Sequence, residues 1–234
     1  IFGVIGCLVF FFCFFNTKER VTIKQEKVSL KANIFCLLHN KPWKLFALNI
    51  VWFFGGFVIQ ASAVIYYFTY VVQNTTLVQI VATITTLVPI VTNLCAPFLV
   101  KLTSKRNLMV GGSFVHMGGL LIIFFGGTNV PVLLAGAVIA AAGYGLKGSM
   151  HFAMQPDPVD YGEWKSGVNT AGTLSAVNGF IGKVGMAIAS SIGAALLQFG
   201  GFDANLAVQT TTAQSYITAT VSYTHLTLPT KLEV

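Results

Sequence analysis

Apolar runs long enough to cross a membrane constrain this chain more than any other feature of its sequence. A helix needs about 20 apolar residues to cross a hydrocarbon core of roughly 30 Å. Six runs approach or exceed that length: residues 1–15, 45–72, 77–100, 108–126, 131–154 and 167–199. The runs are continuously apolar and do not alternate with period two, which favours helices over a barrel. The sequence therefore predicts an all-α integral membrane protein with about six transmembrane helices.

The composition argues against a soluble domain and against a nucleic-acid partner. Hydrophobic residues make up 55% of the chain and charged residues 9%, whereas soluble domains contain about 25% charged residues. The net charge of +7 does not point to nucleic acid, because the basic residues are not interleaved with aromatic residues in a recognition pattern. The four cysteines lack CxxC spacing, so neither a disulfide nor a metal site is predicted.

The loops between the runs alternate in Lys and Arg content. Loops that contain Lys or Arg are residues 16–44, 101–106 and 155–166, and loops without either are 73–76, 126–129 and 200–209. Basic residues concentrate on the cytoplasmic side of membrane proteins. Every second loop is therefore expected to be cytoplasmic, with residue 1 on the outer side.

Lysines inside apolar runs are candidate functional residues, because a charge at the bilayer centre costs at least about 2.5–3.5 kcal/mol. Lys183 lies well inside the run 167–199, among small residues. It is expected to pair with a carboxylate in an ion or substrate site; a structural ion pair and a snorkelling lysine are the alternatives. Lys147 lies near the cytoplasmic end of the run 131–154, where snorkelling to the interface is predicted.

An acidic segment interrupts the basic side of the protein. Asp157, Asp160 and Glu163 are spaced i, i+3, i+6, which places them along one face if the segment is helical. Three interpretations remain open at this point. The acids could form a latch with basic residues of other cytoplasmic loops, bind Mg²⁺, or belong to a solvated polar loop.

Several other patterns in the sequence resemble sites. Residues 143–148 match GxGxxG, but they lie inside an apolar run and follow no strand, so a helix-packing role is predicted instead of dinucleotide binding. His116 is expected in the core. A sugar-sized cavity could be lined by polar and aromatic residues of the runs, which could equally serve packing. These residues are Trp52, Gln60, Tyr66, Tyr67, Thr85 and Asn93.

The acidic segment and Lys183 together carry a family resemblance. Residues 157–167 (DPVDYGEWKSG), followed by 180–185 (FIGKVG), resemble the signature of glycoside-pentoside-hexuronide:cation symporters. This is the group of the melibiose and glucuronide permeases within the major facilitator superfamily. Residues 40–43 (NKPW) and 65–71 (IYYFTYV) support the match, which covers residues 1 to about 215.

The resemblance implies a twelve-helix transporter of the cell membrane in which a sugar binds between two halves and alternating access moves it. This chain would supply the end of helix six through helix eleven, with helix twelve and the N-terminal half missing. The small sugar would be co-transported with a monovalent cation, Na⁺ or H⁺, and no other cofactor is expected.

The resemblance also implies roles for particular residues. Lys183 would lie near the cation site and Asn178 near the sugar. Residues of the acidic segment would form the cytoplasmic gate: Asp157, Asp160, Tyr161 and Glu163. The carboxylates that ligate the cation would belong to the missing half.

The predicted organisation has four segments. Residues 1–15 are a truncated transmembrane helix, and 16–44 form a cytoplasmic loop that suits either the connection between two halves or an amphipathic surface segment. Residues 45–215 form the helical bundle. Residues 221–234 resemble translated adapter sequence and are predicted to be non-native.

A membrane enzyme is the rival from another functional class. A prenyltransferase-like protein could hold Mg²⁺-diphosphate with Asp157, Asp160 and Glu163. Such enzymes usually need a second Asp-rich site, and the sequence contains none. An enzyme is therefore not predicted.

Overall fold

The computed structural model describes residues 2–18, 29–206 and 208–223, and these residues fold entirely into helices and their connections. The elements are α1 (Phe2–Asn16), α2 (Leu30–His39), α3 (Lys41–Tyr66), the π-helix η1 (Tyr67–Val71), α4 (Thr75–Leu102), α5 (Lys105–Phe125), α6 (Val130–Ala153), α7 (Asp157–Ser166), α8 (Ala171–Phe199) and α9 (Thr211–Tyr223). The all-α fold class is therefore confirmed for the described part of the chain.

Five of the predicted membrane-spanning runs are helices long and apolar enough to cross a bilayer, namely α3 with η1, α4, α5, α6 and α8. The first of them begins earlier than its apolar run, because Asn40 caps it. The Asn40 side chain accepts a hydrogen bond from the Trp43 amide at 3.0 Å, and Pro42 follows in the first turn. These helices make the chain a multi-pass membrane protein.

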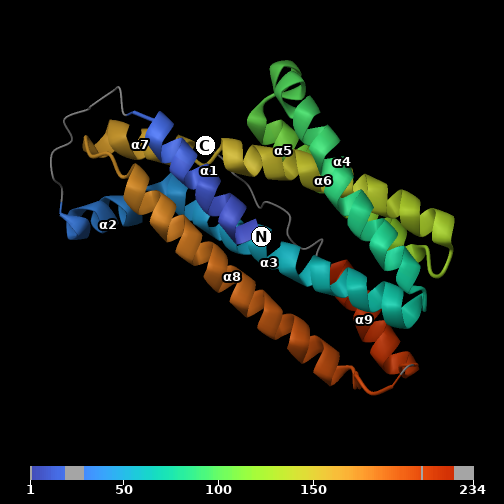
Figure 1. Cartoon of the computed structure of the whole chain (residues 1–234). Helices are drawn as coiled ribbons and strands as arrows, with labels where there is room; N and C mark the ends of the chain where they lie inside the picture. The colour runs from blue at the N-terminus through green and yellow to red at the C-terminus, as the bar shows by residue number, and fades with distance from the viewer. Residues whose placement is uncertain (1, 19–28, 207, 224–234) are drawn as a thin grey trace.

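The helices pack in two groups (Figure 1). Helices α4, α5 and α6 form one group, and α3 with α8 forms the other. Helix α9 contacts α3, α5, α8 and η1 and so connects the groups at one end. An apolar cluster fills that end, with Tyr67, Phe68, Leu120, Leu133 and Ile217 almost completely buried.

Glycines allow α5 and α6 to approach backbone to backbone. A Cβ atom added at Gly119 would lie 2.6 Å from the Ala140 Cα, and one added at Gly143 would lie 2.7 Å from the His116 Cα. His116 is buried and its Nδ1 lies 2.9 Å from the Ala140 carbonyl oxygen across the helix pair. The packing role of Gly143 and the core position of His116 are both confirmed.

Glycines also bring α8 against α3. A Cβ added at Gly185 would lie 3.0 Å from the Val51 Cα, and one added at Gly182 would lie 3.2 Å from the Phe54 ring. Small residues let membrane helices come close enough for dispersion contacts and weak hydrogen bonds to hold them together. Because Gly182 and Gly185 face α3, Lys183 between them lies on another face of α8 and is exposed.

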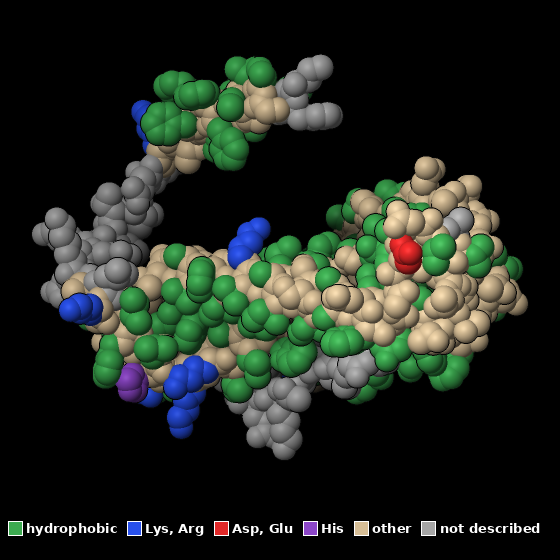
Figure 2. Space-filling view, turned by 90° about the horizontal axis from the view of Figure 1, so that it is seen from below, with side chains coloured by type: hydrophobic (Ala, Val, Ile, Leu, Met, Phe, Trp, Pro, Cys, Tyr) green, Lys and Arg blue, Asp and Glu red, His purple; other side chains and the backbone are tan. Residues whose placement is uncertain are grey.

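The loops group at the two ends of the molecule as the charge alternation predicts. At one end, Lys105 contacts Asp157 and the Asn40 side chain contacts the Pro158 carbonyl. At the other end, the Tyr67 hydroxyl donates a hydrogen bond to the Gly127 carbonyl at 2.6 Å. Figure 2 shows Lys and Arg side chains over the left and middle of the body and an acidic side chain at the right end.

The two ends of the chain differ in how they contact the helical bundle. Helix α1 stands apart from the other helices in Figure 2, and its apolar side chains are exposed, Phe12 by 71% and Phe14 by 75%. Helix α9 continues over residues 221–223, and Val221 in it is 1% exposed. The remainder of the segment 221–234, and residues 19–28 of the loop 16–44, lie outside the described residues.

Substitution of the contact glycine is expected to loosen the α5–α6 pair. Gly119→Ala places a Cβ against the α6 backbone, and overpacking of this kind costs about 1–3 kcal/mol. Gly118→Ala is the matched control, because nothing lies within 4 Å of an added Cβ there. Thermal unfolding of the purified protein in detergent should show a lower Tm for Gly119→Ala only; equal Tm values for the two variants would contradict the packing role.

Candidate functional site

A cleft of about 320 Å³ opens between α3, α4 and α6. That volume lies at the lower end of the range for small-molecule sites, about 300–1,000 Å³. Its walls are mostly apolar, with a few amide and hydroxyl groups. The lining residues are Phe57, Gln60, Ala61, Val64, Ile65, Val78, Ala82, Thr85, Thr86, Ala141 and Tyr144. An apolar cleft with a few polar groups suits a ligand that has both ring faces and hydroxyls.

The structure separates the residues that the sequence suggested for one cavity. Gln60 and Thr85 line the cleft together. Tyr66 lines a second cavity of about 170 Å³ between α3, α8 and α9, and its ring lies 5.2 Å from that of Phe202. Gln60 and Tyr66 therefore do not share a site within this chain, although both lie on α3.

The other suggested cavity residues also lie outside the cleft. Tyr67 is buried in the apolar cluster near η1. Asn93 accepts a hydrogen bond from the Ser149 hydroxyl at 2.6 Å, which joins α4 to α6. Trp52 is 50% exposed on α3. These three residues serve packing, helix contact or an exposed face in the described part of the chain.

A buried aromatic and cationic cluster continues from the cleft between α3 and α6. The Tyr144 ring lies 5.8 Å from the Phe53 ring at an interplanar angle of 11°. The Phe53 ring stacks on His151 at 4.2 Å, and the His151 Nδ1 lies 2.9 Å from the Asn49 Oδ1. The Lys147 ammonium lies 5.6 Å from the centre of the Tyr144 ring and 5.7 Å from that of Phe53. Tyr144 belongs both to this cluster and to the cleft wall.

The interpretation of Lys147 as a snorkelling lysine is wrong. Its side chain is 7% exposed and lies over two aromatic rings instead of reaching toward the interface. Cation–π contacts of this kind offset part of the cost of burial. Phe53 belongs to α3, so the sequence of α6 alone does not reveal what covers Lys147.

Sequence reasoning missed His151 altogether. It is 2% exposed and is held by Asn49 and Phe53. A usable signal was present, because His151 follows Lys147 by four residues and therefore lies on the same face of α6.

Lys183 and Asn178 lie on different faces of α8. Five residues separate them, which corresponds to about 140° around an α-helix. Asn178 is 4% exposed and accepts a hydrogen bond from the Trp43 indole at 3.0 Å, where α8 packs on α3. Its Nδ2 is buried without a hydrogen-bond partner among the described residues. Lys183 is exposed, and it lines neither the cleft nor the second cavity.

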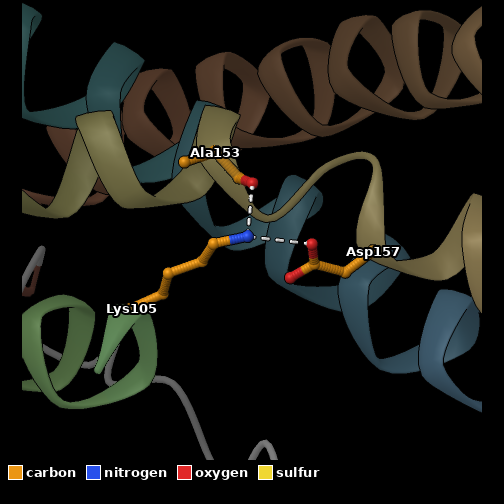
Figure 3. Close-up of polar contacts among 3 residues, drawn as sticks. All are labelled: Lys105, Ala153 and Asp157. Carbon is orange, nitrogen blue, oxygen red and sulfur yellow. Dashed lines mark hydrogen bonds and ion pairs between the residues drawn. The ribbon is translucent and has the colours of Figure 1, made fainter. Parts of the chain in front are cut away.

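The acidic segment forms helix α7, so its carboxylates do have helical spacing. The Lys105 ammonium lies 3.0 Å from the Asp157 Oδ1 and donates a hydrogen bond to the Ala153 carbonyl at 3.3 Å (Figure 3). The two side chains are 44% and 50% exposed. Exposed pairs are worth about 0–1 kcal/mol, so this contact between the first residue of α5 and α7 can break readily.

The remaining predicted gate residues lie along the same helix. Glu163 accepts a hydrogen bond from the Asn169 side chain at 2.9 Å. The centre of the Tyr161 ring lies 6.0 Å from that of Trp164. The Lys165 ammonium lies over the Tyr161 ring, 6.0 Å from its centre. Asp160 is exposed. The described residues contain no group of three His, Cys, Asp or Glu side chains placed to hold a metal ion, so the Mg²⁺ interpretation gains no support.

Helix α7 is also tied to α3. Asn40, which caps α3 with its Oδ1, donates a hydrogen bond from its Nδ2 to the Pro158 carbonyl at 2.6 Å. Asn40 is 3% exposed, and a Cβ added at Gly162 would lie 2.9 Å from its Nδ2. One buried amide therefore connects the start of a spanning helix with the acidic helix.

Comparison with known proteins gives relatives that are named as transporters, symporters or carriers. The isoprimeverose transporter of Lactiplantibacillus pentosus is 32% identical over 209 residues, which cover 88% of this chain and 43% of that protein. The uncharacterized symporter YnaJ of Bacillus subtilis (strain 168) is 32% identical over 88% of this chain and 45% of its own length. The glucuronide carrier protein homolog of Escherichia coli (strain K12) is 29% identical over 88% and 45%. The chain spans less than half the length of these relatives.

A family model described as MFS/sugar transport protein matches residues 1–226. The relatives are transporters, so the rival interpretation as a membrane enzyme is not favoured. The spanning helices, the acidic helix α7 and these matches all point to the same family. The chain belongs to the MFS/sugar transport protein family, the glycoside-pentoside-hexuronide:cation symporters of the major facilitator superfamily.

Proposed function

We propose that this chain is the C-terminal half of a secondary active transporter that moves a sugar across the cell membrane together with Na⁺ or H⁺. The observation that supports this most is the cleft between three spanning helices, in a chain whose relatives include an isoprimeverose transporter and a glucuronide carrier homolog. The N-terminal half would close the site from the other side. Alternating access between two rigid halves then moves the sugar.

The cleft offers the chemistry that a sugar needs. The Gln60 amide and the Thr85 hydroxyl both donate and accept hydrogen bonds, which suits sugar hydroxyls. Phe57 and Tyr144 present ring faces on which the apolar face of a pyranose can pack. Tyr66 and Asn178 do not line this cleft, so a role for either toward the sugar stays a prediction that depends on another conformation.

Lys183 is proposed to act at the cation site. It is exposed in the middle of α8, and the five spanning helices contain no Asp or Glu. A carboxylate partner would therefore belong to the N-terminal half, where it would also ligate Na⁺ or carry H⁺. A lysine that competes with the cation for the same carboxylates would couple cation binding to the conformation of α8.

Helix α7 is proposed to form a cytoplasmic gate. Asp157 pairs with Lys105, and Asp160, Tyr161 and Glu163 lie along the same short helix. Weak, exposed ion pairs suit a gate, because they form and break many times at low cost. The buried link from Asn40 to Pro158 would pass movements of α3 to this helix.

Uptake by the full-length protein tests the proposed function. Cells that express it are given radiolabelled glycosides, pentosides and hexuronides, with and without a Na⁺ or proton gradient. Gradient-dependent accumulation of at least one sugar is expected. Absence of any accumulation, with the protein present in the membrane, would refute transport.

Removal of the Lys183 charge is expected to uncouple transport. Lys183→Ala in the full-length protein should lower gradient-driven accumulation by about 10–100-fold, the range expected for a lost charged hydrogen bond. Exchange of sugar without a gradient should persist. Lys101→Ala, at the exposed end of α4, is the matched control and should change neither the accumulation nor the exchange of sugar. Unchanged accumulation in Lys183→Ala would remove its assigned role.

Charge reversal tests the gate. Lys105→Asp places two carboxylates together and should change the uptake rate by about two- to fivefold, in line with the energy of an exposed pair. The double variant Lys105→Asp, Asp157→Lys should restore the rate, because it restores the attraction. Combining Asp157→Lys with Lys101→Asp should not. If the reciprocal exchange gives no recovery, the pair has no part in gating.

A further inference from the structure

Lys147 presents a buried positive charge beside the cleft. Its side chain is 7% exposed, and its ammonium lies against the rings of Tyr144 and Phe53. Among the described residues the ammonium makes neither a hydrogen bond nor an ion pair. Ring faces alone compensate a buried ammonium only in part, because an opposite charge is the partner that recovers most of the lost hydration.

The spanning helices cannot supply that opposite charge. Within their bounds, α3, α4, α5, α6 and α8 contain no Asp or Glu. Of the acids in the described residues, Asp157 is paired with Lys105, and Asp160 and Glu163 lie further along exposed α7. Asp203 follows Phe202, which packs on the apolar cluster near η1 at the opposite end of the molecule. An anion that meets Lys147 must therefore come from outside this part of the chain.

The neighbouring histidine does not remove the need for an anion. His151 lies one turn further along α6, and its Nδ1 is engaged by the Asn49 side chain. Its ring is fixed between Phe46 and Phe53, with centroid distances of 5.1 Å and 4.2 Å. The ammonium and the imidazole thus lie one turn apart on α6, in the cluster that shares Tyr144 with the cleft wall.

Tyr144 connects Lys147 with the cleft. The same ring lines the cleft with Gln60 and Thr85 and lies 5.6 Å from the Lys147 ammonium. Lys147 itself does not line the cleft, so a substituent of a bound sugar would meet its ammonium beside the Tyr144 ring. Lys183, on α8, is not one of the residues that line the cleft, whereas Lys147 contacts the cleft residue Tyr144.

We propose that Lys147 binds the carboxylate of an acidic sugar and so makes the transporter selective for hexuronates over neutral sugars. This inference rests on the proposed sugar transport. A neutral sugar in the same cleft would leave the ammonium buried and unpaired, and a site that loses such a partner discriminates strongly. The alternative source of the same chemistry is a carboxylate of the N-terminal half.

The test compares isosteric probes in the full-length protein. Uptake of a labelled hexuronate is competed by methyl glycosides of hexuronic acids with a free carboxylate, in the gluco, galacto and manno series, and by the corresponding uncharged amides. At least one hexuronate is expected to compete about 10–100-fold better than its amide, as expected for a charge-assisted contact. This arm uses the unaltered protein, so it does not depend on whether a variant folds.

Two variants assign the selectivity to Lys147. Lys147→Met keeps the length and removes the charge, and it should abolish the preference for the acid over its amide. Lys147→Arg should retain most of the preference. Lys101→Met removes one exposed positive charge and serves as the control. It should leave the preference for the acid over its amide, measured as relative competition, unchanged.

The outcomes separate the inference from the function on which it rests. If neutral sugars are accumulated and no hexuronate is preferred over its amide, Lys147 pairs with a protein carboxylate and the inference is overturned while transport stands. If the preference persists in Lys147→Met, another residue binds the carboxylate and the inference is again overturned. If no sugar of either kind is accumulated, the proposed function itself fails.

Discussion

The backbone contact between α5 and α6 governs where the candidate site lies. A membrane interior offers no water to hydrogen-bond, so helices satisfy their own backbone and then hold together by close packing. At Gly112 an added Cβ would lie 2.9 Å from the Lys147 amide nitrogen, and Gly143 rests on the backbone at His116. The α6 segment that carries Tyr144, Lys147 and His151 is therefore held from behind by α5 while its side chains face α3.

The two ends of the molecule are built from different interactions. The end near η1 and α9 is filled by the apolar cluster, in which Phe68, Leu120 and Ile217 are fully buried. The end near α7 combines two smaller apolar clusters, one around Trp43 and Leu174 and one around Met109 and Met150, with polar contacts of Lys105 and Asn40. Apolar clusters resist opening because many contacts must break together, whereas single polar contacts exchange readily with water. Under the proposed function, this difference makes the α7 end the one that opens most easily.

Much of the fold follows from local sequence, and much of the site does not. Hydrophobic length predicts the spanning helices, Lys and Arg content predicts how the loops group, and the glycines at 143–148 predict packing. Helical geometry alone separates Lys183 from Asn178. The burial of Lys147 depends on Phe53, nearly a hundred positions earlier in the chain. The sequence around Lys147 does not indicate which distant residue packs on it. The separation of Gln60 from Tyr66 likewise depends on which helices pack on either side of α3.

The π-helix η1 sets the phase of the α3 segment. In a π-helix the backbone hydrogen bonds span five residues, one more than in an α-helix. Side chains after the π-helix are therefore rotated about the helix axis relative to those before it. Residues before η1, such as Gln60, line the cleft, while Tyr67 and Phe68 within it turn into the apolar cluster. Loss of one residue here would rotate the two sets against each other by about 100°. The wide turn thus lets one continuous helix line the cleft at one level of the membrane and pack into the apolar cluster at the next.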